Sequence, residues 1–226
     1  MKYAVCDLSA AIAADTLAAY AAAQQRQLRE QYAECFDGDG VTDEVRVAAS
    51  DDVPATDEIL ICLEPNAPTD EAGAIGYHAL GVIHVFLDIA AQAGVSWQSV
   101  ASHEVLENRA DPRLHACVEL DDGTIWDREV CDRVEADTYQ IDGVELSNFN
   151  TPECFEPTPG ANEKYDWLGL STKPNEVRPG GYAQQFTLDQ GWTQVGEMRA
   201  YRKALSDLGL SRGAKRRSRL PAGDQK

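Results

Sequence analysis

Apolar and polar positions in the first half of the chain follow strand and helix periods in turn. Between the first two strands, the apolar positions Leu17, Leu28 and Tyr32 mark one side of a long helix, which Ser9 can cap and which extends to about Phe36. A second helix begins near Ser96 and stops before Pro112, because proline disfavours helical backbone in the residue before it. Runs rich in β-branched residues predict four strands, at residues 2–8, 44–50, 58–65 and 83–90.

Beyond Pro112 the pattern changes to short extended segments. Asp122-Gly123 and Asp142-Gly143 predict hairpin turns between them, and Pro and Gly become frequent from Thr151 onward. The spacing of residues 195–210 predicts a last helix. The pattern therefore predicts an α+β protein made of four parts: an N-terminal subdomain (1–112), a strand- and loop-rich C-terminal subdomain (113–190), a C-terminal helix (191–211) and a basic tail (212–226).

Composition narrows the class of protein. Hydrophobic residues make up 43% and charged residues 26% of the 226 residues, which is typical of a globular protein, and no apolar run approaches the ~20 residues of a membrane span. The first residues lack the continuous apolar stretch of a secretory signal. The six cysteines are scattered without a CxxC pair, which favours reduced thiols, most of them small buried apolar residues. We therefore expect a protein of the cytoplasm without membrane contact.

Charge is distributed unevenly along the chain. Residues 1–211 hold 14 basic and 37 acidic residues, a formal net charge of −23, and six basic residues in the tail raise the total to −18. The acidic body should repel nucleic acid and anionic membranes over most of its surface. The tail RGAKRRSR (212–219) is the one segment suited to a phosphate backbone or an acidic neighbour, and a merely solvated end is the alternative.

The string HEVLE, residues 103–107, carries the strongest chemical signal. His103 and Glu107 are four positions apart on a helix, so an imidazole nitrogen and a carboxylate oxygen project side by side and can bind one cation. Glu104, the residue after His103, lies next to these two side chains around the helix and can take a proton from a metal-bound water. The alternative is a helix whose His and Glu face solvent or pair with arginine.

The helical period also places acidic residues on the side that apolar residues mark for burial. Val100, Glu104, Glu107 and Asp111 fall in a narrow arc with His103 on its flank. Burying unpaired carboxylates is costly, so this arc requires cations, hydrogen-bond donors or a metal. The opposite face is expected to carry Gln98, Ser99, Ser102 and Arg109.

Two resemblances rest on these residues. The order strand, long helix, strands and HExxE helix in residues 1–112 resembles zincins, in which a mixed sheet carries a backing helix and the active-site helix runs beneath it. The run SHEVLE, DP, CD-x-VE and a closing GGY, between Gly76 and Tyr182, resembles a group of proteins without established activity that tailed bacteriophages and prophages encode. The resemblance implies a phage-encoded, zincin-like protein in the cytoplasm of a bacterial host or in the virion.

The sequence departs from the zincin pattern at one ligand. HExxH peptidases have a second His where Glu107 stands. A His-plus-carboxylate set is harder and more anionic, which leaves zinc as the first choice of metal but keeps manganese or calcium open. Asp132 in EVCDRVE is the expected third ligand, because the resemblance includes that segment. Tyr139 is the candidate donor to a developing oxyanion. Glu135 is the second choice for this ligand, and Asp111 or His115 is the third. In the alternative interpretation, Asp132 and Glu135 are ordinary surface acids of an acidic protein.

Two functions follow from different classes. The first is a metal-dependent hydrolase, a peptidase, with metal on His103, Glu107 and Asp132 and with Glu104 as general base. The second is a structural protein of a phage particle. Its acidic body would bind the basic tail of another copy or another phage structural protein, and only the tail would contact nucleic acid. His78 and His84 are expected to be a loop residue and a strand residue.

Overall fold

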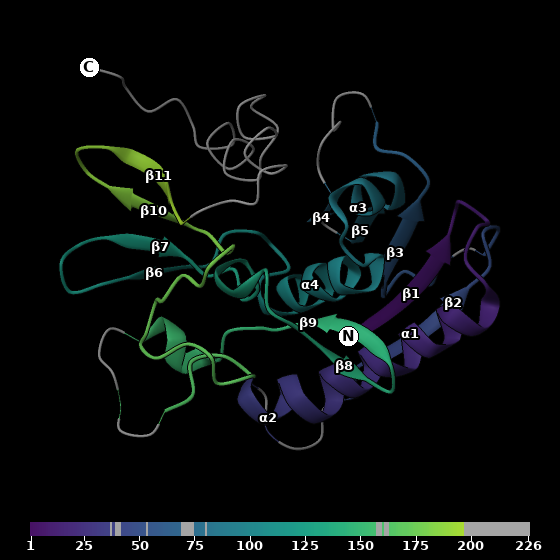
Figure 1. The fold of residues 1–226 in the computed structure, drawn as a ribbon, viewed down its shortest axis with the longest axis horizontal. Helices are drawn as coiled ribbons and strands as arrows, with labels where there is room; N and C mark the ends of the chain where they lie inside the picture. The colour runs from purple at the N-terminus through teal and green to yellow at the C-terminus, as the bar shows by residue number, and fades with distance from the viewer. Residues whose placement is uncertain are drawn as a thin grey trace.

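The structure, a computed structural model, is of mixed α and β composition (Figure 1). It describes residues 1–36, 38, 42–52, 54–68, 75–79, 81–156, 160 and 163–196. The α+β class expected from the sequence is confirmed. Within these ranges no helix combines the length and the apolar character that crossing a membrane requires.

A five-stranded mixed sheet forms the N-terminal half. Four of its strands run parallel, and β4 lies antiparallel to β5 at one edge, in the order β2-β1-β3-β5-β4. The strand expected at 83–90 ends at Phe86, where helix α3 (Leu87–Ala93) begins, so the second half of that prediction is wrong. Strand bounds are β1 Lys2–Asp7, β2 Glu44–Ala48, β3 Glu58–Glu64, β4 Gly76–Ala79 and β5 Val82–Phe86.

The two long helices follow the sequence pattern closely. The first consists of α1 (Ala14–Arg26), a π-helical stretch (Gln27–Tyr32) and α2 (Ala33–Phe36). It starts after Ala13, and Ser9 instead hydrogen-bonds Asp7, so the predicted cap is wrong. Helix α4 (Trp97–Ala110) is confirmed, since the Ser96 side chain accepts a hydrogen bond from Gln98 N and the helix ends before Pro112.

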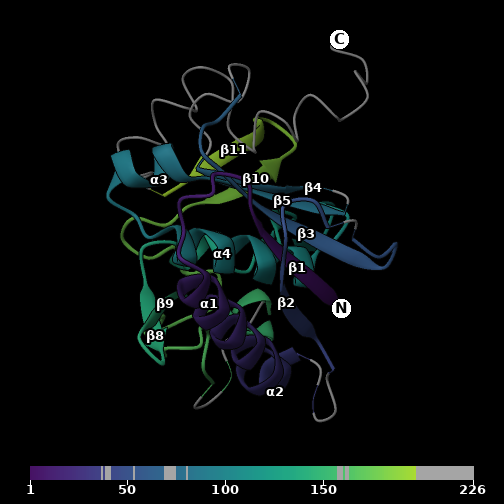
Figure 2. The ribbon, with the colours of Figure 1, turned by 90° about the vertical axis from the view of Figure 1, so that its right-hand side faces the viewer.

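Helix α4 lies at the centre of the molecule (Figure 2). One side packs against β4 and β5, and the other packs against β9 (Val144–Ser147) of a hairpin that β8 (Thr138–Ile141) begins. Every residue from Ser99 to Asn108 is therefore buried, including Ser99 and Ser102 on the face expected to be polar. Ser102 Oγ donates to Gln27 Oε1 at 2.8 Å, which satisfies this buried hydroxyl.

The C-terminal half adds a second sheet of four antiparallel strands, in the order β11-β10-β7-β6. Both expected turns are confirmed: Gly123 has φ 79°, and Asp142 and Gly143 have φ 51° and 82°, as a tight hairpin turn requires. The helix expected over 191–211 is wrong for Gly191–Val195, which form β11, and residues 197–226, including the tail, lie outside the described residues. The bounds are β6 Cys117–Glu119, β7 Ile125–Asp127, β10 Ala183–Thr187 and β11 Gly191–Val195.

One hydrophobic core contains residues from before and after residue 112 in the chain. It extends from Tyr3 and Val5 on the first sheet through Val105 and Leu106 of α4 to Phe149 beyond the β8–β9 hairpin. The chain beyond residue 112 thus packs directly on the helix that carries HEVLE, and its side chains can complete a site there.

Candidate metal centre

Helix α4 brings three of the expected site residues together. His103, Glu104 and Glu107 are all buried, with exposed fractions of 4%, 1% and 0%. His103 Nε2 lies 3.0 Å from Glu107 Oε1, as the four-residue spacing on a helix predicts. The alternative of a solvent-facing helix side is therefore wrong for these residues.

Asp132 approaches the same imidazole from the chain beyond α4. It begins a short 3-10 helix (Asp132–Val134), and its Oδ1 lies 3.2 Å from His103 Nε2. The PGGY segment holds this turn in place: Tyr182 N donates to Asp132 O at 2.9 Å. Gly181 is required at this contact, since a Cβ there would lie 2.2 Å from the Arg133 carbonyl oxygen.

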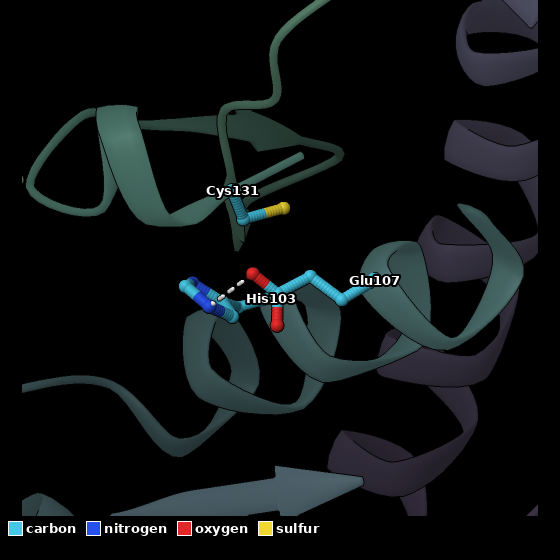
Figure 3. Close-up of side chains that lie close together, drawn as sticks. All are labelled: His103, Glu107 and Cys131. Carbon is cyan, nitrogen blue, oxygen red and sulfur yellow. Dashed lines mark ion pairs between the residues drawn. The ribbon is translucent and has the colours of Figure 1, made fainter. Parts of the chain in front are cut away.

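Cys131 also joins the group, which the sequence interpretation did not foresee. Its Sγ, a nitrogen of His103 and a carboxylate oxygen of Glu107 all lie within 4.8 Å of one another (Figure 3). The thiol is fully buried and is not in a disulfide. Burial raises the pKa of Cys131 well above its ordinary value, and the nearby Glu107 carboxylate adds to this shift. Without a cation the group is thus a neutral thiol.

The electrostatic field at His103 favours positive charge. Burial by itself lowers the pKa of an imidazole, but the carboxylates of Glu107 and Asp132 outweigh it and raise the pKa of His103 to about 10. Both carboxylates contact one nitrogen, so this point in the protein attracts a proton or a metal cation.

His78 is the second residue that the sequence interpretation missed. It lies on strand β4 and not in a loop, with a side chain that is 0% exposed. Its Nδ1 is 3.3 Å from Glu104 Oε2 and 4.0 Å from Glu107 Oε2. Gly76, two positions earlier on the same strand face, allows this approach, because a Cβ there would lie 2.9 Å from Val100 Cγ1.

Asp111, His115 and Glu135 are in neither of the described groups that could hold a metal ion. Tyr139 OH hydrogen-bonds with Gln27 and Gln31 of the long helix. His115 Nδ1 pairs with Asp111 Oδ1 at 3.3 Å just beyond the end of α4. Glu135 is half-buried, three positions beyond Asp132.

The donor set fits a divalent transition metal. In the group whose ligand atoms all lie within 4.8 Å of one another, His103 offers nitrogen, Glu107 oxygen and Cys131 sulfur, which are ligand types of zinc. Asp132 is not part of this group, but its Oδ1 brings a further oxygen 3.2 Å from His103 Nε2. The described structure holds buried His, Glu and Cys groups that could bind a metal ion. The roles of Glu104 as base and of Asp132 as ligand stay predictions.

Comparisons of the chain with protein-family models, with curated proteins and with solved structures found no match.

Proposed function

We propose that the protein is a metal-dependent hydrolase, a peptidase of zincin-like architecture, with a divalent metal on His103, Glu107 and Asp132. The observation that carries this proposal is the convergence of two buried carboxylates on one imidazole nitrogen, at 3.0 and 3.2 Å. When bound, the metal supplies Lewis acidity toward a substrate carbonyl and a water. Zinc is the proposed metal.

Glu104 performs the proton transfer in this proposal. It follows His103 directly in the chain. The carboxylates of Glu104 and Glu107 both lie near the His78 imidazole. His78 Nδ1, at 3.3 Å, is within hydrogen-bond distance and orients the Glu104 carboxylate. Glu104 then takes a proton from water and returns it to the leaving amine, as a general base and acid does.

The architecture supports the zincin-like part of the proposal. A mixed sheet is backed by the long helix α1, and α4, which carries HEVLE, runs along the same face of the sheet. Two segments of the phage-protein resemblance, CD-x-VE and GGY, meet where Tyr182 N donates to Asp132 O. This hydrogen bond joins the two segments beside His103, which supports a common role for them in the centre.

A non-catalytic structural protein of the phage particle, with the zincin-like fold as a scaffold, is the second candidate, and the burial of the centre favours the absence of catalysis. The side chains of His103, Glu107 and Asp132 are only 5%, 0% and 2% exposed, whereas a substrate must reach a catalytic metal. Cys131 decides between the two roles. Four protein ligands close a structural metal site, whereas three leave a position open for water and substrate.

Elemental analysis of the purified protein tests both candidates. We expect at least one zinc per chain, bound at the centre built from His103, and hydrolysis of fluorescent casein that Glu104→Gln abolishes while this zinc remains. Cys131→Ala should keep the zinc if the site is open, and should lower zinc affinity at least ~10-fold if Cys131 is a fourth ligand. A protein without any bound metal, or full activity of Glu104→Gln, would contradict the hydrolase.

The basic tail is proposed to contact another subunit or nucleic acid. Six basic residues beyond 211 follow a body with net charge −23, so tail and body are complementary between chains. Sedimentation of a protein lacking residues 212–226, with and without added DNA, is the test. We expect the truncated chain to lose assembly or DNA binding that the full chain shows at about 0.1 M salt and loses near 1 M. Identical behaviour of both chains would contradict the proposal.

A further inference from the structure

The carboxylate of Glu107 faces two different imidazoles with its two oxygens. Oε1 lies 3.0 Å from His103 Nε2, and Oε2 lies 4.0 Å from His78 Nδ1. In Figure 3 the oxygen that does not point to His103 is turned away from that ring. Glu107 is thus shared by two groups of potential ligands: His103, Glu107 and Cys131, and His78, Glu104 and Glu107.

The second group has the properties of a cation site. The ligand atoms of His78, Glu104 and Glu107 lie within 4.8 Å of one another, and all three residues are buried. The carboxylates of Glu104 and Glu107 therefore lie close together beside the His78 imidazole, away from bulk water. A cation between them would offset the repulsion between the two negative charges.

An independent observation concerns the other nitrogen of His78. The ring is fully buried, and Nε2 has no hydrogen-bond partner among the described residues. Leaving a buried polar atom unpaired costs on the order of 1–3 kcal/mol. The nitrogen that faces Glu104 and Glu107 is Nδ1, so Nε2 is the nitrogen that keeps its proton when Nδ1 binds a cation.

We propose that the protein binds a second divalent cation between His78, Glu104 and Glu107, so that Glu107 bridges two adjoining cations. This inference rests on the proposed function for its first cation and adds strand β4 to the centre. Carboxylate-bridged pairs of cations suit nitrogen and oxygen ligands of this kind. The edge strand supplies the ligand, and Gly76 lets that strand lie close enough to α4.

The second cation has a consequence for the chemistry. Glu104 cannot hold a cation and accept a proton with the same oxygen, since coordination lowers the basicity of a carboxylate. Occupancy of the second site therefore suppresses general-base action by Glu104. Hydrolysis should rise as the first site fills and fall as the second fills, which makes the free cation concentration a regulator of the enzyme.

Cation stoichiometry tests the proposal without a known substrate. The full chain is stripped with a chelator, titrated with Zn²⁺ by calorimetry and analysed for bound zinc. We expect two zinc ions per chain in the unsubstituted protein, one in His78→Ala and in Glu104→Gln, and none in Glu107→Ala. His84→Ala is the matched control and should leave two, because His84 Nδ1 contacts Glu64 and His84 is in neither of the two groups of potential ligands.

Each outcome separates the two proposals. A single zinc in the unsubstituted protein, unchanged by His78→Ala, overturns the second site and leaves the proposed function standing. No zinc at all overturns both. Loading with Mn²⁺ gives a second readout, because two bridged Mn²⁺ ions produce an exchange-coupled electron paramagnetic resonance spectrum, and an isolated ion does not. If His78→Ala does not fold, Glu104→Gln decides by the same count.

Discussion

Two buried charged clusters adjoin helix α4 and are neutralised in different ways. Near its C-terminal end, Arg109 Nε lies 3.0 Å from the fully buried Asp43, and the guanidinium lies over the Tyr32 ring at 5.6 Å. Two residues earlier on the helix, the contacts of Glu107 described above are with imidazoles, which carry charge only when protonated. The first cluster is therefore neutralised by a permanently charged arginine. The second contains only imidazoles, so its positive charge can come from a proton or from a metal cation that exchanges with solvent.

The comparison is tested most strongly at Arg109. Arg109→Met keeps apolar packing over Tyr32 but leaves Asp43 with less positive charge, so we expect the free energy of unfolding to fall by about 3 kcal/mol. Urea denaturation measures this, with the exposed Arg113→Met as the control. The loss should be equal with and without a chelator. A chelator-dependent loss would mean that the two clusters are not independent.

Metal removal gives the next largest effect, at the other cluster. A cation present at 100 times its dissociation constant stabilises the folded state by about 2.7 kcal/mol, which a chelator should abolish. Thermal unfolding with and without zinc is the measurement. Glu107→Ala should make the two curves coincide, whereas Arg109→Met should preserve their separation. Coincident curves for the unsubstituted protein would show that the cluster around Glu107 is neutralised by protons alone.

Gly76→Ala should perturb the second cluster from the side of the sheet. The added Cβ would lie 2.9 Å from both His84 O and Val100 Cγ1, so β4 must move away from α4. We expect a loss of about 2 kcal/mol in unfolding free energy, within the usual range for overpacking. Because His78 moves with β4, zinc binding should fall from two ions to one. Two ions retained in the folded variant would mean that β4 need not lie this close.

An exposed pair gives the smallest effect and calibrates the others. Arg26 Nη1 lies 2.5 Å from Asp142 Oδ2, with side-chain exposed fractions of 46% and 72%. Solvent screens such pairs, so Arg26→Gln should leave the unfolding midpoint in urea within experimental scatter. A clear shift would show that exposure is a poor guide to the strength of these pairs, and would weaken the contrast drawn along α4.

The sequence by itself determined what depends on neighbouring residues. Ser96 and Pro112 bounded α4 correctly, because capping and the proline constraint act within one turn. The juxtaposition of His103 with Glu107 followed from the helical period alone. Asp122-Gly123 and Asp142-Gly143 predicted their hairpins for the same local reason.

Only the tertiary structure decided which distant segments complete the centre. His78 reaches Glu104 because β4 adds antiparallel to the sheet edge over α4, and the EVCD segment reaches His103 because the PGGY backbone holds it there. Ser102 is buried because the β8–β9 hairpin covers a face whose own pattern predicts exposure. Strand pairing and helix packing depend on residues far apart in the chain, so a local period shows which side chains share a face but not what covers that face.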